Sequence, residues 1–192
     1  MAEYAYGCVK RLAKALAANK VPAEVAERVL EGGEHLVEGD KDSNTEWFRG
    51  AMERMDGLLD VATVRAAREA CACCLGGKRL KLSQAIARDH ETLEARIKAA
   101  NETPFVFGNN VSMTEDGEVL VGFFPEGVEH HGCPCLRITS EPLPISYCYC
   151  CGGHVKHHMQ KALGRKLEVT VLQSALASAG KAGCRFSLRI VE

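Results

Sequence analysis

The chain has 192 residues, of which 46% are hydrophobic and 26% are charged, and its formal net charge is −1 at pH 7. The near-neutral charge argues against a nucleic-acid-binding protein, because such proteins usually carry a clearly basic surface. The sequence has no apolar run long enough to span a bilayer, and residues 1–20 lack the apolar centre of a secretory signal. We therefore expect a cytoplasmic protein that contacts neither nucleic acid nor membrane.

The first half of the sequence predicts helices. Apolar residues recur at three- and four-residue steps over residues 5–16, which is the pattern of one buried helix face. Pro22 suits the first turn of a second helix, which should end at Gly32. Residues 43–46 have the sequence of a capping box that precedes an apolar stripe. Further helices are expected over residues 61–75 and 83–100.

The pattern changes after residues 101–104, the best candidate boundary. An acidic turn with a glycine at residues 115–118 predicts a hairpin that leads into a strand over 119–124. Strict alternation over residues 184–190 predicts a strand with one buried face. Other strands are expected at 105–107, 136–139, 145–149 and 167–172, with a helix at 155–163.

These elements predict an α+β fold, in which a helical N-terminal half packs on a mostly antiparallel sheet with a C-terminal helix. We divide the chain into a helical region, residues 1–100, and an α+β metal-binding region, residues 101–192. The two regions are compatible with one compact domain, because 192 residues suffice for a single sizeable hydrophobic core.

Ten cysteines are a high count for a chain of this length. In a protein without a secretory signal, such a count indicates metal ligands or redox chemistry rather than a disulfide framework. Eight of the ten fall into three short groups, and neighbouring cysteines rarely form disulfides with each other because the geometry is strained. The groups are Cys71/Cys73/Cys74, Cys133/Cys135 and Cys148/Cys150/Cys151.

The first group lies at the predicted end of a helix. Cys71 and Cys74 are three residues apart, so their side chains would share one helix face. The partial negative charge of a helix C-terminus disfavours a bare thiolate, and a bound cation would offset that penalty. This favours metal ligation over nucleophilic chemistry, although Cys71 could equally be a small core residue.

The second group is the most informative part of the sequence. Cys148 and Cys151 have the C-x-x-C spacing that is common in zinc half-sites. Gly152 and Gly153 would allow the tight turn of a zinc knuckle. His154 follows three residues after Cys151, and His158 lies four residues further on the same helix face. The alternative is that some of the histidines are ordinary surface residues.

The sequence predicts one zinc ion per chain, held by thiolates and an imidazole. The ligands are expected among Cys71, Cys74, Cys148, Cys151 and His154. Neither cluster supplies four good ligands alone, so the two clusters must meet in space. Cys133 and Cys135 could add ligands, form a redox pair or simply pack beside the site. Additional candidate ligands are Cys73, Cys133, Cys135, Cys150 and His158. Iron, or an iron–sulfur cluster, is the alternative cofactor.

The C-terminal part also carries a family resemblance. Residues 147–154, 167–172 and 183–188 resemble the end of bacterial proteins grouped with L-2-amino-thiazoline-4-carboxylate hydrolase and of the related 4-vinyl reductase domains. Gly183, Cys184 and Phe186 match a glycine, a cysteine and an aromatic residue at the last strand of those families. The resemblance implies an antiparallel sheet packed by helices, a zinc ion and a small-molecule ligand.

Two functions are compatible with these observations. The first is a small-molecule-binding or sensing module in which zinc is fully ligated by protein side chains. The second is a metal-dependent hydrolase or reductase that acts on a small molecule, with an open zinc position for water. The ample supply of cysteines and the lack of a glutamate beside the histidines favour the module. The expected partners are a metal ion and a small molecule, and a homodimer is left open.

Overall fold

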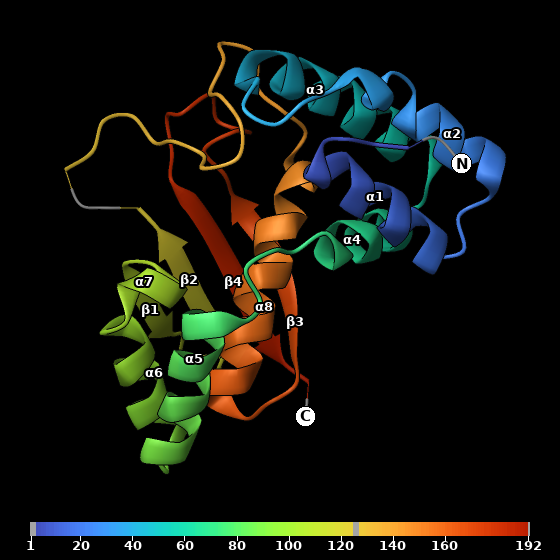
Figure 1. The fold of residues 1–192 in the computed structure, drawn as a ribbon. Coiled ribbons are helices and arrows are strands. Elements are labelled where there is room, and N and C mark those ends of the chain that lie inside the picture. The colour runs from blue at the N-terminus through green and yellow to red at the C-terminus, as the bar shows by residue number, and fades with distance from the viewer. Residues whose placement is uncertain (1–2, 125–126, 192) are drawn as a thin grey trace.

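A computed structural model of the chain describes residues 3–124 and 127–191. It has the predicted α+β fold, with N-terminal helices and an antiparallel sheet (Figure 1). The helices before the sheet are α1 (Gly7–Ala18), α2 (Ala23–Leu30), η1 (Gly33–His35), α3 (Lys41–Leu58), α4 (Val61–Ala70), α5 (Gly77–Asp89), α6 (Leu93–Asn101) and α7 (Pro104–Phe107). Within the described residues, no helix is both long enough and apolar enough to cross a membrane.

The sheet comes from the second half of the chain. Its strands are β1 (Asn110–Met113), β2 (Val119–Phe123), β3 (Leu167–Gln173) and β4 (Cys184–Ile190). They lie in the order β1-β2-β4-β3, and every neighbouring pair is antiparallel. Phe186 of β4 is fully buried between Val121 of β2 and Val171 of β3, as the alternation over 184–190 predicted.

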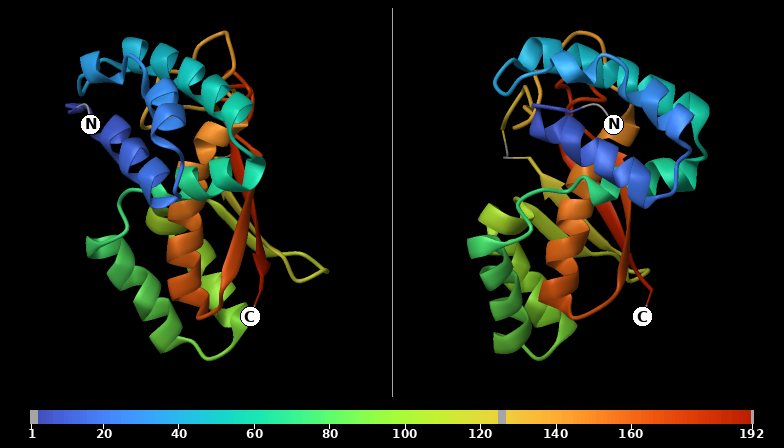
Figure 2. Two further views of the ribbon diagram at one scale, coloured as in Figure 1. Left: turned by 90° about the vertical axis from the view of Figure 1, so that its right-hand side faces the viewer. Right: turned by 45° about the vertical axis from the view of Figure 1, so that its right-hand side comes forward.

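Helix α8 (Tyr149–Leu163) is the central element, and the short helix η2 (Ile145–Cys148) leads directly into it. Figure 2 shows α8 running along the sheet, with the N-terminal helices above and α5 and α6 beside it. It contacts α4, α5 and β3. Gly153 permits the close approach of α4, since a Cβ atom at this position would lie 2.3 Å from the Glu69 carbonyl oxygen. Both glycines lie inside α8 and Gly153 serves helix packing, so the prediction of a tight turn at Gly152 and Gly153 was wrong.

Several other predictions differ from the structure. Asp40 caps α3 in place of a capping box at residues 43–46, and α4 ends at Ala70 although a helix was expected over 61–75. Residues 105–107 form the short helix α7 rather than a strand, because Pro104 starts a helical turn. Residues 145–149 form η2 and the start of α8 instead of a strand. Residues 136–139 are not in a strand, and the helix expected over 83–100 is interrupted between Asp89 and Leu93.

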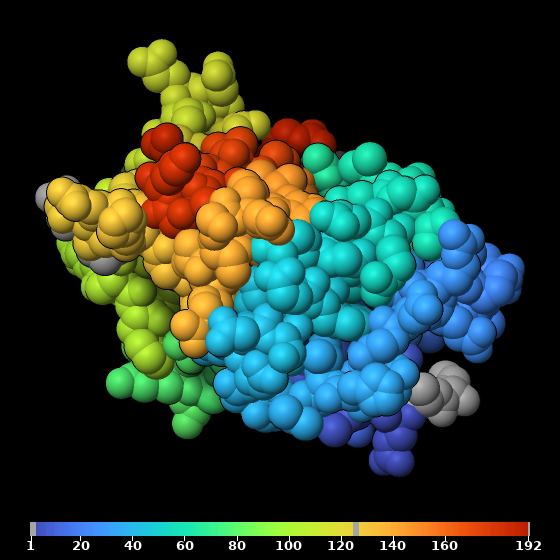
Figure 3. Space-filling view, turned by 90° about the horizontal axis from the view of Figure 1, so that it is seen from above, coloured from blue at the N-terminus to red at the C-terminus, as the bar shows by residue number. Residues whose placement is uncertain are grey.

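The two halves of the chain pack directly on each other. Figure 3 shows α3, in cyan, against the orange segment that precedes α8. Arg49 of α3 donates to the Thr139 hydroxyl at 2.7 Å and to the Glu141 carbonyl at 2.9 Å. Ser146 donates to the Asp56 carboxylate at 2.8 Å. One cluster of buried apolar side chains includes residues of both halves, so the core is shared.

Candidate functional site

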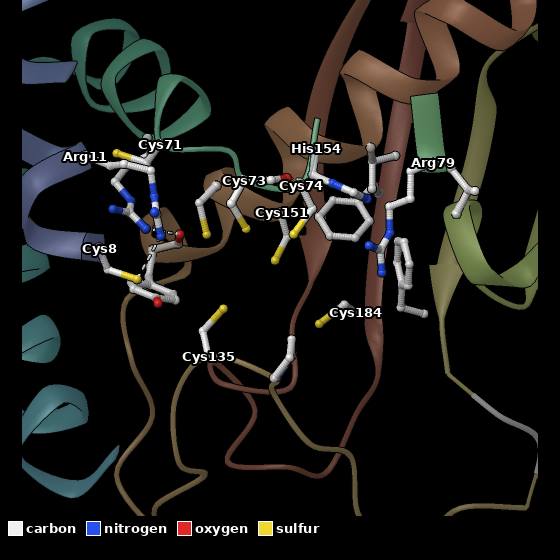
Figure 4. A pocket seen from close by; sticks show the side chains of 18 of the residues that line it. Cys8, Arg11, Cys71, Cys73, Cys74, Arg79, Cys135, Cys151, His154 and Cys184 are labelled. Carbon is white, nitrogen blue, oxygen red and sulfur yellow. Dashed lines mark hydrogen bonds between the residues drawn. The ribbon is translucent and has the colours of Figure 1, made fainter. Parts of the chain in front are cut away.

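A cavity of about 490 Å³ lies where the N-terminal helices, the start of α8 and the sheet meet (Figure 4). Eight of the ten cysteines of the chain line it, together with His154. These cysteines come from six segments: α1, the end of α4, the loop before α5, the loop before η2, the start of α8 and β4. They are Cys8, Cys71, Cys73, Cys74, Cys135, Cys150, Cys151 and Cys184.

The structure thus brings most of the predicted ligands to one cavity. Four of the five main candidates line it, namely Cys71, Cys74, Cys151 and His154. Cys148 is buried and is not among the lining residues. Of the additional candidates, Cys73, Cys135 and Cys150 line the cavity, whereas Cys133 and His158 do not.

All ten cysteines lie in the described part of the chain, and all are free thiols. Within the described residues, no three His, Cys, Asp or Glu side chains lie close enough together to hold a metal ion as they stand. The thiols instead influence one another in pairs, Cys73 with Cys74, Cys133 with Cys135 and Cys150 with Cys151, and these pairings shift the pKa of Cys73, Cys133 and Cys150. A metal ion would therefore require side chains from different pairs to rotate toward one another.

Three histidines of α8 hold the loop that carries Cys73 and Cys74. His154 Nδ1 lies 3.0 Å from the Cys73 carbonyl oxygen, His158 Nε2 lies 3.1 Å from that of Cys74, and His157 Nε2 lies 3.1 Å from that of Leu75. A carbonyl oxygen only accepts hydrogen bonds, so each ring nitrogen must donate. We call this set of three contacts the histidine clamp.

His154 and His158 differ in which ring nitrogens have a hydrogen-bond partner. His154 donates through Nδ1, which leaves the lone pair on Nε2 available for a metal ion or a proton. Burial lowers the pKa of His154, so this neutral form is favoured. His158 is fully buried, and its second nitrogen lies 3.0 Å from the Ser83 hydroxyl. Both nitrogens of His158 are thus occupied by the fold, and it could bind a metal only by breaking one of these contacts.

Cys150 and Cys151 lie in the first turn of α8, where the helix dipole favours negative charge. A hydrogen bond from Cys151 lowers the pKa of Cys150 to about 6, and the Arg68 guanidinium acts in the same direction. The same contact raises the pKa of Cys151. By contrast, burial raises the pKa of Cys148 to about 12. Of the two thiols at the start of α8, Cys150 is therefore the acidic one.

Arg68 of α4 is the most buried charged residue of the cavity wall, and the sequence reasoning missed it. It is only 2% exposed, it lines the cavity, and its Nε atom has no hydrogen-bond partner. Its Nη2 donates to the Tyr147 carbonyl at 2.9 Å, and the guanidinium lies over the Tyr147 ring at 4.6 Å. Arginine in a helical stretch is usually a surface residue, so the sequence gave no signal of this burial.

The sequence matches one known protein family. A sequence profile described as a family of unknown function, DUF6144, matches residues 9–190. The chain belongs to DUF6144. The matched region contains every cysteine that lines the cavity except Cys8, as well as His154 and Arg68. No curated protein matches the sequence significantly. The resemblance to the 4-vinyl reductase domains stays a prediction.

Proposed function

We propose that this member of DUF6144 is a small-molecule-binding or sensing module, and that its thiol-lined cavity is the binding site. The observation that carries the proposal is the convergence of eight cysteines from six segments on one cavity. The volume, about 490 Å³, lies within the range of small-molecule sites. The arginines, the thiols and His154 make up about half of the lining residues, and the others are mostly apolar or aromatic.

A zinc ion is the second part of the proposal. The side chains best placed to hold it are Cys73, Cys74, Cys151 and His154. His154 contacts the Cys73 carbonyl and lies three residues after Cys151 on the same helix, so these groups share one side of the cavity (Figure 4). Thiolates and a neutral imidazole form a donor set that suits zinc. Four protein ligands would close the site, which fits a module better than an enzyme.

The enzyme alternative depends on His154. Among the described residues, no aspartate or glutamate lines the cavity, so a carboxylate base is absent from this wall. The Nε2 atom of His154 is then the available proton acceptor for a hydrolase. If Nε2 binds zinc instead, it cannot also accept a proton, and the metal would have a structural role.

The test of the zinc proposal is the metal content of reduced protein purified without a histidine tag. We expect about one zinc per chain, as for structural four-ligand sites. The double change Cys73→Ser/Cys74→Ser, and separately Cys151→Ser, should release the metal and lower the thermal midpoint. Iron with a visible absorption band would indicate the iron–sulfur alternative.

The matched control is Cys148→Ser, since this cysteine belongs to the same C-x-x-C motif but does not line the cavity. It should keep the metal while losing stability, because a hydroxyl would be buried in the core. Full zinc occupancy in Cys151→Ser, together with loss of zinc in Cys148→Ser, would contradict the cavity as the metal site.

A further inference from the structure

We propose that the cavity binds an organic anion, with its acid group on the Arg68 side and its apolar body against the phenylalanines that line the wall. This inference rests on the proposed function, because it names the class of small molecule that the site takes. The supporting observations are the charge of the cavity wall, the burial of Arg68 and the position of the aromatic rings.

Apart from the acidic Cys150 thiol near Arg68, the charged side chains on the wall are of one sign. Three arginines line the cavity, Arg11 from α1, Arg68 from α4 and Arg79 from α5, and among the described residues no carboxylate does. The described ion pairs do not include Arg68. The Arg68 guanidinium is buried with thiols beside it, chiefly Cys150, rather than a carboxylate. An anion that reaches Arg68 would further offset the cost of burying this charge. Arginine also presents a planar fork that matches carboxylate, sulfonate and phosphate groups.

Arg68 is held in place before any ligand arrives. Its guanidinium stacks over the Tyr147 ring at 4.6 Å and lies 5.7 Å from the Phe48 ring centre. The hydrogen bond to the Tyr147 carbonyl fixes its orientation, and Nε remains without a partner. A charged donor that is already oriented loses little entropy on binding, which favours affinity.

The rest of the wall suits an apolar body. Phe123 and Phe186 line the cavity from the sheet, with their rings 6.0 Å apart, edge to face. Phe105 of α7 is 52% exposed, and the Arg79 guanidinium lies 4.3 Å from its ring centre. Figure 4 shows Arg11 and Arg79 on opposite sides of the thiols. The buried charge therefore lies at the inner, Arg68 side, and the Arg79–Phe105 pair marks the solvent side.

Two fluorescent probes that share one aromatic body test the inference. 8-Anilinonaphthalene-1-sulfonate carries a sulfonate, and N-phenyl-1-naphthylamine is the same skeleton without it. We expect the sulfonate probe to bind the full-length protein with 1:1 stoichiometry, at least about tenfold more tightly than the neutral probe. Arg68→Met should weaken binding of the sulfonate probe by at least about tenfold and leave binding of the neutral probe unchanged.

Further variants keep the test decisive if Arg68→Met fails to fold. Arg11→Gln removes a charge from the half-buried wall and should weaken only the sulfonate probe. Arg88→Gln is the matched control, because Arg88 is exposed, pairs with Asp89 and does not line the cavity. It should bind both probes like the wild-type protein.

The affinities of the two probes test the anion inference separately from the small-molecule function of the cavity. Equal affinity for the two probes, or unchanged sulfonate binding in the folded Arg68 and Arg11 variants, would overturn the anion inference and leave a small-molecule pocket. Failure of both probes to bind would overturn the small-molecule function of the cavity itself. The zinc content is measured independently of either result.

Discussion

The C-terminus of α4 and the N-terminus of α8 each place a cysteine on the cavity wall, and the pKa values of the two thiols shift in opposite directions. Cys71 caps the C-terminus of α4, where its thiol donates to the Ala67 carbonyl at 3.2 Å. Burial raises the pKa of Cys71, even though Arg68 opposes this effect. Cys150 lies in the first turn of α8, and there the hydrogen bond from Cys151, assisted by Arg68, lowers the pKa to about 6.

The difference comes mainly from the burial of Cys71 and from the Cys151 and Arg68 side chains beside Cys150, and the two helix ends act in the same directions. A helix C-terminus offers carbonyl oxygens, which accept the thiol proton and keep it bound. A helix N-terminus offers N–H groups, which stabilise the thiolate. The cavity therefore holds a protonated thiol and an acidic thiol on facing walls, and the packing of α4 on α8 determines how they face each other.

The largest expected effect is on that packing. Gly153→Ala places a Cβ 2.3 Å from the Glu69 carbonyl oxygen, so α4 and α8 must move apart. We expect a loss of about 3 kcal/mol in the free energy of unfolding, at the upper end for overpacked sites. Gly152→Ala is the control, since its Cβ would meet Val169 at an ordinary 3.5 Å. Urea denaturation measures both, and equal stability of the two variants would contradict the close contact.

The next largest effect is a loss of stability at acidic pH, and it concerns His158, which holds the loop between α4 and α5. Burial lowers the pKa of His158 to about 4, whereas an unfolded imidazole titrates near 6.5. Between these values the unfolded state binds more protons, so stability falls as the pH falls from 6.5 toward 4, by at most about 1.4 kcal/mol per pH unit. The free energy of unfolding measured from pH 7 to pH 4.5 should show this slope.

His158→Gln should flatten the slope, whatever its effect on stability at pH 7. His35→Gln is the comparison, because the His35 side chain is 82% exposed, and it should keep the wild-type slope. If the slope persists in His158→Gln, another group carries the acid sensitivity.

A smaller effect tests the thiols themselves. On reduced, metal-free protein at pH 7, iodoacetamide should modify Cys150 faster than Cys71, as followed by peptide mass spectrometry. Cys151→Ala removes the hydrogen bond and should raise the pKa of Cys150. Each unit by which that pKa exceeds the assay pH lowers the thiolate fraction about tenfold. Cys151→Ser retains a hydrogen-bond donor, so its rate of Cys150 modification should lie between those of the wild-type protein and Cys151→Ala. Similar rates in all three proteins would contradict the role of Cys151.

The smallest expected effect is at a cavity thiol away from both helix ends. Cys184 of β4 is half-buried and accepts a hydrogen bond from the Ala175 amide at 3.4 Å. A serine hydroxyl can accept the same bond, so Cys184→Ser should cost less than about 1 kcal/mol by urea denaturation. A loss above about 2 kcal/mol would place this thiol in the packed core rather than on the cavity wall.

The sequence predicted the fold class well because the helices and the last strands have clear apolar periods. It also predicted that the Cys71–Cys74 and Cys148–His154 segments meet, since neither offers a full set of ligands. The start of α8 was placed six residues too late, at Val155 instead of Tyr149. Two consecutive glycines usually end a helix, and the position of α4 explains why Gly153 lies inside this one.

The cavity itself could not be predicted, because its wall is a tertiary feature. Cys8 and Arg11 belong to a helix whose pattern is that of any amphipathic segment, and Arg79 resembles a solvent-facing residue. Arg68 lies in the stretch that precedes the first cysteine group, yet nothing in its neighbours marks a buried charge. Their common surface exists only after α1, α4 and α5 have packed around the start of α8.

The histidine clamp holds its loop through backbone carbonyl groups rather than through the side chains of the loop. The imidazoles bind the carbonyl groups of Cys73, Cys74 and Leu75, and every amino acid has such a carbonyl. Cys74 even adopts a left-handed backbone with φ of 60°, a conformation that the clamp holds despite its strain. The shape of the loop is thus held independently of the side chains at positions 73 and 74. On the proposed function, replacing these two thiols would change what the cavity binds without rebuilding the loop.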